Sequence, residues 1–201
     1  KKSGSLTVSH LRFGKNPIRS TYIVNSANFI ACHNYSFLNK YDILKNAEHG
    51  ATFLLNAPFE TNDVWNHLPH KIQEEIIEKQ LRFYVINASK VAREANMGSR
   101  VNTILQTCFF AISGILTKED AIGKIKDAIK KTYSDKGEKV VLKNYAAVDQ
   151  AIANLHEIDY STLKPGNIEY EKIVPDEAPD FVKNVLAKIM AFEGDELPVS
   201  S

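Results

Sequence analysis

The chain has 201 residues, of which 44% are hydrophobic and 24% are charged. These values are typical of a globular protein, and the length is sufficient for one domain with a buried core and some appendages. The formal net charge is only +1. It argues against a general nucleic-acid or membrane-surface binder, because such proteins usually carry a strong basic excess. No apolar run approaches about 20 residues, so we expect no transmembrane helix.

Two cysteines, Cys32 and Cys108, lie far apart and within apolar runs. Without a CxxC pair, cysteines can build neither an iron–sulfur cluster nor a structural zinc site in this chain. Isolated thiols fit a reducing compartment, so we expect a cytoplasmic protein in which both are small core residues. The sequence begins at Lys1 without an initiator Met or a hydrophobic signal region, which indicates either a piece of a longer chain or a processed one.

The first half of the chain alternates between short apolar runs and segments with helical spacing. Residues 18–24 form a short docking segment in this interpretation. Strands are predicted at residues 6–13, 28–33, 51–55 and 83–86, and helices at residues 36–44, 60–68 and 69–80. This order predicts an α/β fold with three layers, α/β/α, around a mostly parallel Rossmann-like sheet.

The second half of the chain is predicted to be helical and then extended. Helical spacing predicts helices at residues 88–94 and 104–112 and a further helix that begins after an N-cap at Thr117. A last stripe of apolar residues at helical spacing ends near Ile158. Residues 161–180 contain three prolines and little periodicity, which indicates a linker or strap. An amphipathic helix at residues 181–192 is expected to dock on a neighbouring domain or subunit. We therefore expect an α/β domain at residues 1–160 and a linker with a docking helix at residues 161–201.

Asparagines follow three of the predicted strands, at Asn34, Asn56 and Asn87. In open α/β sheets the carboxyl ends of the parallel strands form the edge that binds ligands, so these amides are candidate binding groups. Turn and cap chemistry is the simpler explanation of each asparagine taken alone, because asparagine is favoured at such positions.

A Gly-Ser-Arg turn ending at Arg100 precedes the apolar helix at residues 104–112. Free N–H groups, the helix dipole and a guanidinium together favour an anion at such a place. The alternative is an ordinary connection with a surface arginine. The flexible Lys1, Lys2 and Ser3 would add phosphate-binding groups if they converge there, and are otherwise a solvated end.

No residue set forms a self-sufficient catalytic site. His67 and His70 are close in sequence, but an HxxH pair without a third ligand is more typical of two solvated histidines at helix ends than of a metal site. The chain contains no nucleophile elbow, no P-loop and no complete GxGxxG motif. We therefore assign no catalytic residue and no metal ligand to this chain.

Several segments together resemble the pyruvate:ferredoxin (flavodoxin) oxidoreductases, and within them the domain equivalent to the gamma subunit of 2-oxoacid:acceptor oxidoreductases. The matching segments are TVSHLRFG (7–14), PIRS (17–20), FIACHN (29–34), SFL (36–38), ATFLLNAP (51–58), KVAREANMGSRVNTILQT (90–107), FFA (109–111) and NYAAVDQA (144–151). The resemblance covers nearly the whole chain. One departure is that family members usually have a glycine-rich strand–loop–helix unit before residues 1–4, and the sheet here is expected to lack it.

The resemblance implies oxidative decarboxylation of pyruvate with coenzyme A, with reduction of ferredoxin or flavodoxin. It implies thiamine diphosphate, Mg²⁺ and [4Fe–4S] clusters on other domains or subunits of a full enzyme that is expected to be a homodimer. This domain is implied to bind CoA, with Lys1, Lys2 and Ser3 on phosphates, Arg100 and Asn102 on the nucleotide or diphosphate, and Gly98 allowing close backbone approach. The alternative is a structural domain that packs the enzyme without binding a ligand. Neither nucleic acid nor membrane is an expected partner.

Overall fold

The computed structural model describes residues 7–14, 16–19, 23–170, 172 and 174–200. Its centre is a four-stranded sheet formed by β1 (Ala27–Cys32), β2 (Ala47–Asn56), β3 (Arg82–Ile86) and β4 (His156–Glu157), in that spatial order. The first three strands are parallel, with Phe53 of β2 opposite Phe83 of β3, whereas β4 runs antiparallel to β3. The predicted α/β class with a mostly parallel sheet is therefore confirmed.

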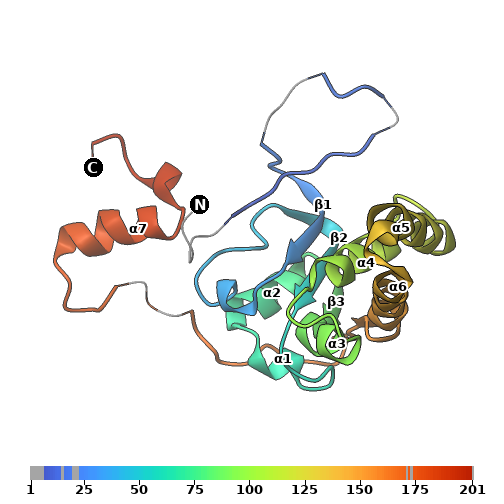
Figure 1. The fold of residues 1–201 in the computed structure, drawn as a ribbon. Coiled ribbons are helices and arrows are strands. Elements are labelled where there is room, and N and C mark those ends of the chain that lie inside the picture. Colours follow the sequence, from blue (N-terminus) through green and yellow to red (C-terminus); the bar gives the residue numbers. More distant parts are fainter. Residues whose placement is uncertain (1–6, 15, 20–22, 171, 173, 201) are drawn as a thin grey trace.

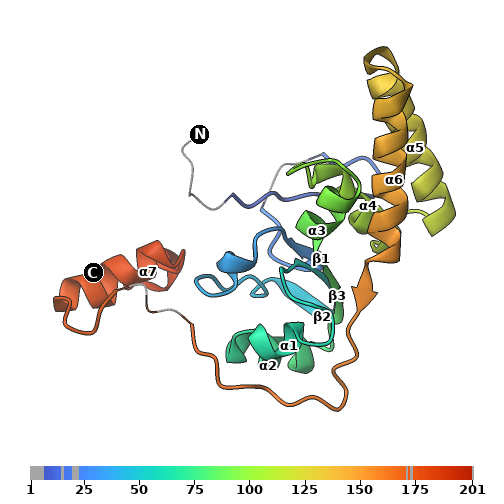
Figure 2. The same cartoon turned by 60° about the horizontal axis from the view of Figure 1, so that its bottom comes forward.

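Side chains alternate along the central strands and feed two cores on opposite faces of the sheet. Phe53, Leu55 and Phe83 pack with the residues of α1 (Val64–His67) and α2 (His70–Glu78). Leu54 and Ile86 instead pack under α3 (Ala88–Glu94), α4 (Asn102–Ile112) and α6 (Glu138–Ala153). Figures 1 and 2 show these two helical layers on either side of the strands. Because both faces are covered, the buried parts of the two central strands, residues 51–55 and 83–86, are almost entirely apolar, as is usual for parallel sheets.

Helix α5 (Lys118–Tyr133) and helix α6 form a long antiparallel hairpin joined by the 3₁₀ turn η2 (Ser134–Lys136). Ile125 and Ile129 of α5 pack against Val141 and Val148 of α6 in a separate core. The hairpin rests on α4 at its base and rises away from the sheet (Figure 2). The sequence pattern predicted both helices, including the Thr117 N-cap, whose Oγ1 accepts a hydrogen bond of 3.2 Å from the Asp120 N–H.

The chain then returns to the other side of the sheet. Residues 160–170 cross α1 and α2 without regular structure, and Trp65 Nε1 donates to the Lys164 carbonyl at 3.0 Å. The last part contains the π-helical turn η3 (Val182–Leu186), α7 (Ala187–Met190) and the 3₁₀ turn η4 (Gly194–Glu196). It contacts the turn after β1, where the rings of Tyr41 and Phe192 lie 5.4 Å apart.

Four predicted elements differ from the structure. The strand predicted at residues 6–13 is wrong for its described residues, 7–13, because no strand in the described part of the chain pairs with them, and Val8 and Leu11 are exposed. Residues 36–44 form only a 3₁₀ turn, η1 (Tyr35–Phe37), followed by irregular turns. The segment is capped and bent by Asn34, whose side chain accepts a hydrogen bond from the Ser36 N–H.

The other two differences concern where helices begin and end. The helix predicted at residues 60–68 is confined to α1, because residues 60–63 form a turn. Helix α6 ends at Ala153 and not near Ile158. The backbone there extends to pair with β3, and the Ile158 N–H donates to the Phe83 carbonyl at 2.8 Å. Backbone pairing with the open edge of β3 ends the helix, and the helical spacing of apolar residues contains no information about this pairing.

Candidate functional site

The asparagines at the carboxyl edge of the sheet hold the strand ends together. Asn56 Nδ2 donates to the His33 carbonyl at 3.0 Å, and its Oδ1 accepts from the Ala88 N–H at 3.0 Å. Asn87 caps α3 by accepting from the Lys90 N–H at 2.9 Å. The turn and cap interpretation is thus the one that the geometry supports, because these amide groups are already used.

A small cavity of about 50 Å³ lies beside the end of β3. Its wall includes Asn87, Lys90, Asn154 and His156. Lys90 Nζ lies 3.2 Å from Glu60 Oε1, which also lines the cavity. The volume suits one or two water molecules and is far below that of ordinary cofactor sites.

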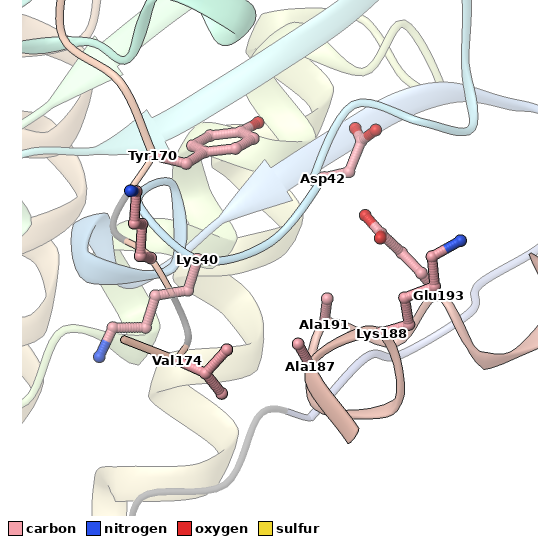
Figure 3. A pocket seen from close by; sticks show the side chains of 9 residues that line it. Lys40, Asp42, Tyr170, Val174, Ala187, Lys188, Ala191 and Glu193 are labelled. Carbon is pink, nitrogen blue, oxygen red and sulfur yellow. The ribbon is translucent and has the colours of Figure 1, made fainter. Parts of the chain in front are cut away.

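A larger cavity of about 300 Å³ lies between the turn after β1 and the C-terminal helix (Figure 3). The ammonium groups of its wall come from Lys40, Lys172 and Lys188, and the acidic groups from Asp42 and Glu193. Sequence analysis singled out none of these residues as a candidate binding group, because they come from segments far apart in the sequence that only the fold brings together. Mixed charges of both signs give this cavity no clear preference for anions.

Tyr170 forms the inner wall of that cavity. Burial, together with the nearby carboxylates of Asp42 and Glu75, raises the pKa of Tyr170 above its usual range. Burial also raises the pKa of Glu75, and the Asp42 carboxylate adds to that effect. Lys71 Nζ lies 2.6 Å from Asp42 Oδ2 and balances part of this negative charge.

The Gly-Ser-Arg turn connects α3 to α4 on the face that α6 also covers. The chain reverses at Asn96 and Gly98, whose φ angles are +56° and +64°. No side chain caps the start of α4, so its first N–H groups remain available to a ligand. Arg100 and Asn102 are exposed, and within the described ranges neither side chain has a hydrogen-bond or ion-pair partner.

These features fit the donor chemistry that a phosphate needs, which is a guanidinium, an amide and uncapped backbone N–H groups. The space beside the Gly98 Cα is open, and the glycine suits the positive φ of the turn. Lys1, Lys2 and Ser3 lie outside the described residues. Neither Arg100 nor Asn102 lines the two cavities described above.

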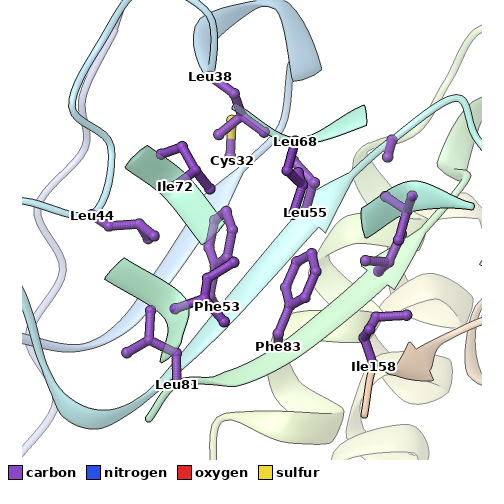
Figure 4. Packing of buried hydrophobic residues seen from close by; sticks show 14 of the residues in the cluster. Cys32, Leu38, Leu44, Phe53, Leu55, Leu68, Ile72, Leu81, Phe83 and Ile158 are labelled. Atoms are coloured by element: carbon purple, nitrogen blue, oxygen red, sulfur yellow. The ribbon is translucent and has the colours of Figure 1, made fainter. Parts of the chain in front are cut away.

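The side chains of His67 and His70 contact groups of the protein itself, and the two cysteines are buried in the core. His67 Nε2 lies 2.8 Å from Asp63 Oδ2, and His70 Nδ1 lies 2.7 Å from the Gly166 carbonyl oxygen. Burial raises the pKa of Cys32 to about 11 and that of Cys108 to about 12; Figure 4 shows Cys32 inside the core. Among the residues that the structure describes, no three side chains of the metal-binding types gather.

The comparison with protein families is decisive. The family model described as pyruvate ferredoxin/flavodoxin oxidoreductase matches residues 1–154. The chain belongs to this family. A second model, described only as a domain of unknown function, matches residues 167–201 of this oxidoreductase-family chain. The resemblance found in the sequence is thereby confirmed.

Relatives of this family match over the whole chain. It is 51% identical to a putative pyruvate-flavodoxin oxidoreductase of Synechocystis, 52% identical to the pyruvate-flavodoxin oxidoreductase of Nostoc, and 44% identical to the pyruvate:ferredoxin oxidoreductase of Moorella thermoacetica. In each case the match covers 100% of this chain and 17% of the relative.

A solved structure supports the fold of this family member. Subunit PORC of the pyruvate oxidoreductase from Thermotoga maritima superposes with a TM-score of 0.53 at 14% identity, covering 68% of this chain and 67% of the subunit. Across the described part of the chain, no helix is both long enough and apolar enough to cross a membrane.

Proposed function

We propose that this chain acts as the CoA-holding domain of an enzyme that oxidatively decarboxylates pyruvate to acetyl-CoA and CO₂. The two electrons released pass to ferredoxin or flavodoxin. The observation that carries the proposal is the match of about half of all residues, over the whole chain, to proteins named pyruvate-flavodoxin oxidoreductase. Because the chain spans 17% of those relatives, other domains or subunits supply the rest of the activity.

Arg100 and Asn102 are the residues of this chain that we assign to CoA, together with Lys1, Lys2 and Ser3. A guanidinium forms bidentate hydrogen bonds to phosphate oxygens, and an amide donates one more. CoA would supply the thiol that accepts the acetyl group. In this proposal the domain binds and orients CoA. We assign no proton transfer and no bond cleavage to its residues.

Thiamine diphosphate, Mg²⁺ and [4Fe–4S] clusters belong to other parts of the enzyme in this proposal. Cys32 and Cys108 do not fit cluster ligation, because both thiols are buried and lie in separate cores on opposite faces of the sheet. The partners of this domain are therefore the cofactor-bearing domains or subunits of a cytoplasmic homodimer, with ferredoxin or flavodoxin as the acceptor.

The test uses the full multidomain enzyme. Arg100→Ala should raise the KM for CoA by about tenfold or more, because a charge-assisted hydrogen bond contributes about 1.5–3 kcal/mol. Its kcat should stay unchanged when CoA is saturating. Arg93→Ala is the matched control, because Arg93 is an exposed arginine in the last turn of α3.

A purely structural role for this domain gives the opposite pattern. Substitution of Arg100 would then lower the yield of assembled enzyme and leave the KM for CoA unchanged. That result would remove CoA binding from this site, whereas the family membership would stand.

A further inference from the structure

The free end of the α5–α6 hairpin carries a cluster of lysines. We call this end the basic tip, and it comprises Lys130, Lys131, Lys136, Lys139 and Lys143, with Asp135 and Glu138 as its acidic residues. Five ammonium groups against two carboxylates make the tip strongly positive, although the whole chain has a net charge of only +1. One projecting feature thus carries a local excess of positive charge.

The lysines of the tip are exposed and are not neutralised by the protein itself. Within the described residues, none of them forms an ion pair. The hairpin neutralises a lysine nearer its base, where Lys126 Nζ lies 2.6 Å from Asp149 Oδ1. An exposed cluster in which unpaired charges of one sign predominate produces a local field that steers partners of the opposite sign.

The tip also presents an apolar contact between its charges. Leu142 is 55% exposed, although its neighbour Val141 is buried in the hairpin core. Helical spacing places Lys139, Leu142 and Lys143 on the same outward face of α6. An apolar side chain with charged neighbours is the usual arrangement of a small protein interface.

Two alternatives to a transient protein partner fit these features less well. Nucleic-acid sites use arginine for bidentate phosphate contacts, and the tip has no arginine and includes two carboxylates. A permanent interface between subunits is large and apolar, whereas most exposed side chains of the basic tip are charged, and the hairpin that carries the tip projects from the rest of the fold (Figure 2). Weak electron-transfer encounters bury small areas and depend on electrostatic steering, so they match both the size and the charge of the tip.

We propose that the basic tip is a docking point for the acidic surface of the electron-carrier protein that accepts electrons from the enzyme. This inference rests on the proposed function, since it names the surface used by the acceptor of that reaction. Leu142 contacts an apolar spot on the carrier, and the surrounding lysines pair with its carboxylates. The tip holds the carrier, and the electrons come from centres on other domains.

The experiment compares two electron acceptors with the full enzyme, an acidic flavodoxin and the small dye methyl viologen. Lys139→Glu/Lys143→Glu should raise the KM for flavodoxin by about tenfold at low ionic strength, because charge reversal converts attraction into repulsion. The difference should shrink as salt is added. Pyruvate-dependent reduction of methyl viologen should be unchanged, because a dye needs no docking surface. Leu142→Ser should raise the KM for flavodoxin about threefold, with less dependence on salt.

A control with the same change in charge is available on the same hairpin. Lys118→Glu/Lys124→Glu alters two exposed lysines in the N-terminal half of α5, away from the basic tip, and should leave both activities unchanged. If the unmodified enzyme does not reduce methyl viologen with pyruvate, the proposed function itself fails.

Three results would overturn the docking proposal while the proposed function stands. The first is an unchanged KM for flavodoxin in the tip variant. The second is an equal loss of methyl viologen reduction or of enzyme assembly, which would place the tip against another domain. The third is a loss of binding to duplex DNA in the tip variant together with an unchanged KM for flavodoxin, which would make nucleic acid the partner.

Discussion

At the scale of single residues, the two buried thiols are side chains whose protonation depends on the fold. Burial raises the pKa of Cys32 to about 11 and of Cys108 to about 12, from an ordinary value of 9.0. Below pH 9 each thiol is protonated in both the folded and the unfolded chain. As the pH rises from 9 towards 11 and 12, the unfolded chain loses protons that the folded chain retains, so stability falls.

We therefore predict that the free energy of unfolding decreases between pH 9 and pH 11, by about 1.4 kcal/mol per pH unit for each thiol. Urea unfolding of the chain at pH 9, 10 and 11 measures this slope. Replacing Cys108 by Val should remove the contribution of that thiol and make the slope shallower. An unaltered slope would show that tyrosine ionisation causes the pH dependence. Both thiols should resist a thiol reagent at pH 8 until the chain unfolds.

Single residues also show what sequence reasoning cannot decide. Asn56 follows a strand in the position of a ligand-binding group, but it joins the ends of β1 and β3 through two hydrogen bonds. An amide serves either role with the same chemistry. Only the positions of the His33 carbonyl and the Ala88 N–H, which come from other segments, distinguish them.

At the scale of secondary structure, Gly123 is the residue of helix α5 with the lowest helix propensity. It is exposed in the interior of the helix, and an added Cβ would meet no atom within 4 Å. Alanine has a higher helix propensity than glycine, and it lowers the conformational entropy of the unfolded chain. Gly123→Ala should therefore stabilise the folded chain by about 0.5–1 kcal/mol. Thermal unfolding followed by circular dichroism measures the change.

Gly114 provides the contrasting variant, because its surroundings are equally open but its φ is +71°. Gly114→Ala should destabilise the chain by about 1 kcal/mol, since an L-residue is strained there. Stabilisation by both variants would mean that local backbone conformation does not control these positions.

The elements differ in how well the sequence predicts them. The long helices α5 and α6 each have a repeated apolar stripe, and α5 also has the Thr117 N-cap, so the existence of both helices follows from local pattern. Residues 7–14 alternate like a strand, but a strand needs a partner, and pairing is not encoded in one segment. The two residues of β4 carry no pattern at all, and only the open edge of β3 defines them.

At the scale of the whole molecule, the segment at residues 160–170, the strap, crosses α1 and α2 on the face of the sheet opposite the hairpin. The Gly166 N–H donates to Gln73 Oε1 at 2.6 Å, and Gln73 Nε2 donates to the Trp65 carbonyl at 2.6 Å. The His70 N–H donates to the Ile168 carbonyl at 2.6 Å. One buried amide therefore connects the strap to both α1 and α2.

The sequence could predict an extended segment here but not its course, because proline content and missing periodicity say nothing about what a segment crosses. The same limit applies to the candidate site. The Gly-Ser-Arg turn was recognisable from its residues, and the family resemblance assigned it to CoA. Local pattern could not show whether Arg100 and Asn102 would be exposed and without protein partners, since that depends on how α3, α4 and α6 pack.

The contact through Gln73 leads to a prediction for the whole fold. Gln73→Ala leaves the Gly166 N–H without its partner and removes one of the two hydrogen bonds to the Trp65 carbonyl, in a site where the Gln73 side chain is only 1% exposed. The unsatisfied N–H, the lost hydrogen bond and the vacated volume together should cost about 2–4 kcal/mol of unfolding free energy. The loss should be global, since the strap and both helices of this face share the contact, so urea unfolding followed by circular dichroism and by Trp65 fluorescence should shift together.

The exposed Gln106 of α4 is the matched control, and Gln106→Ala should change the free energy of unfolding by less than about 0.5 kcal/mol. If Gln73→Ala shifts only the fluorescence transition and leaves the circular dichroism transition in place, the strap unfolds separately from the sheet. The buried amide would then hold a local appendage rather than close the fold, and the C-terminal part of the chain would be free to move relative to the sheet.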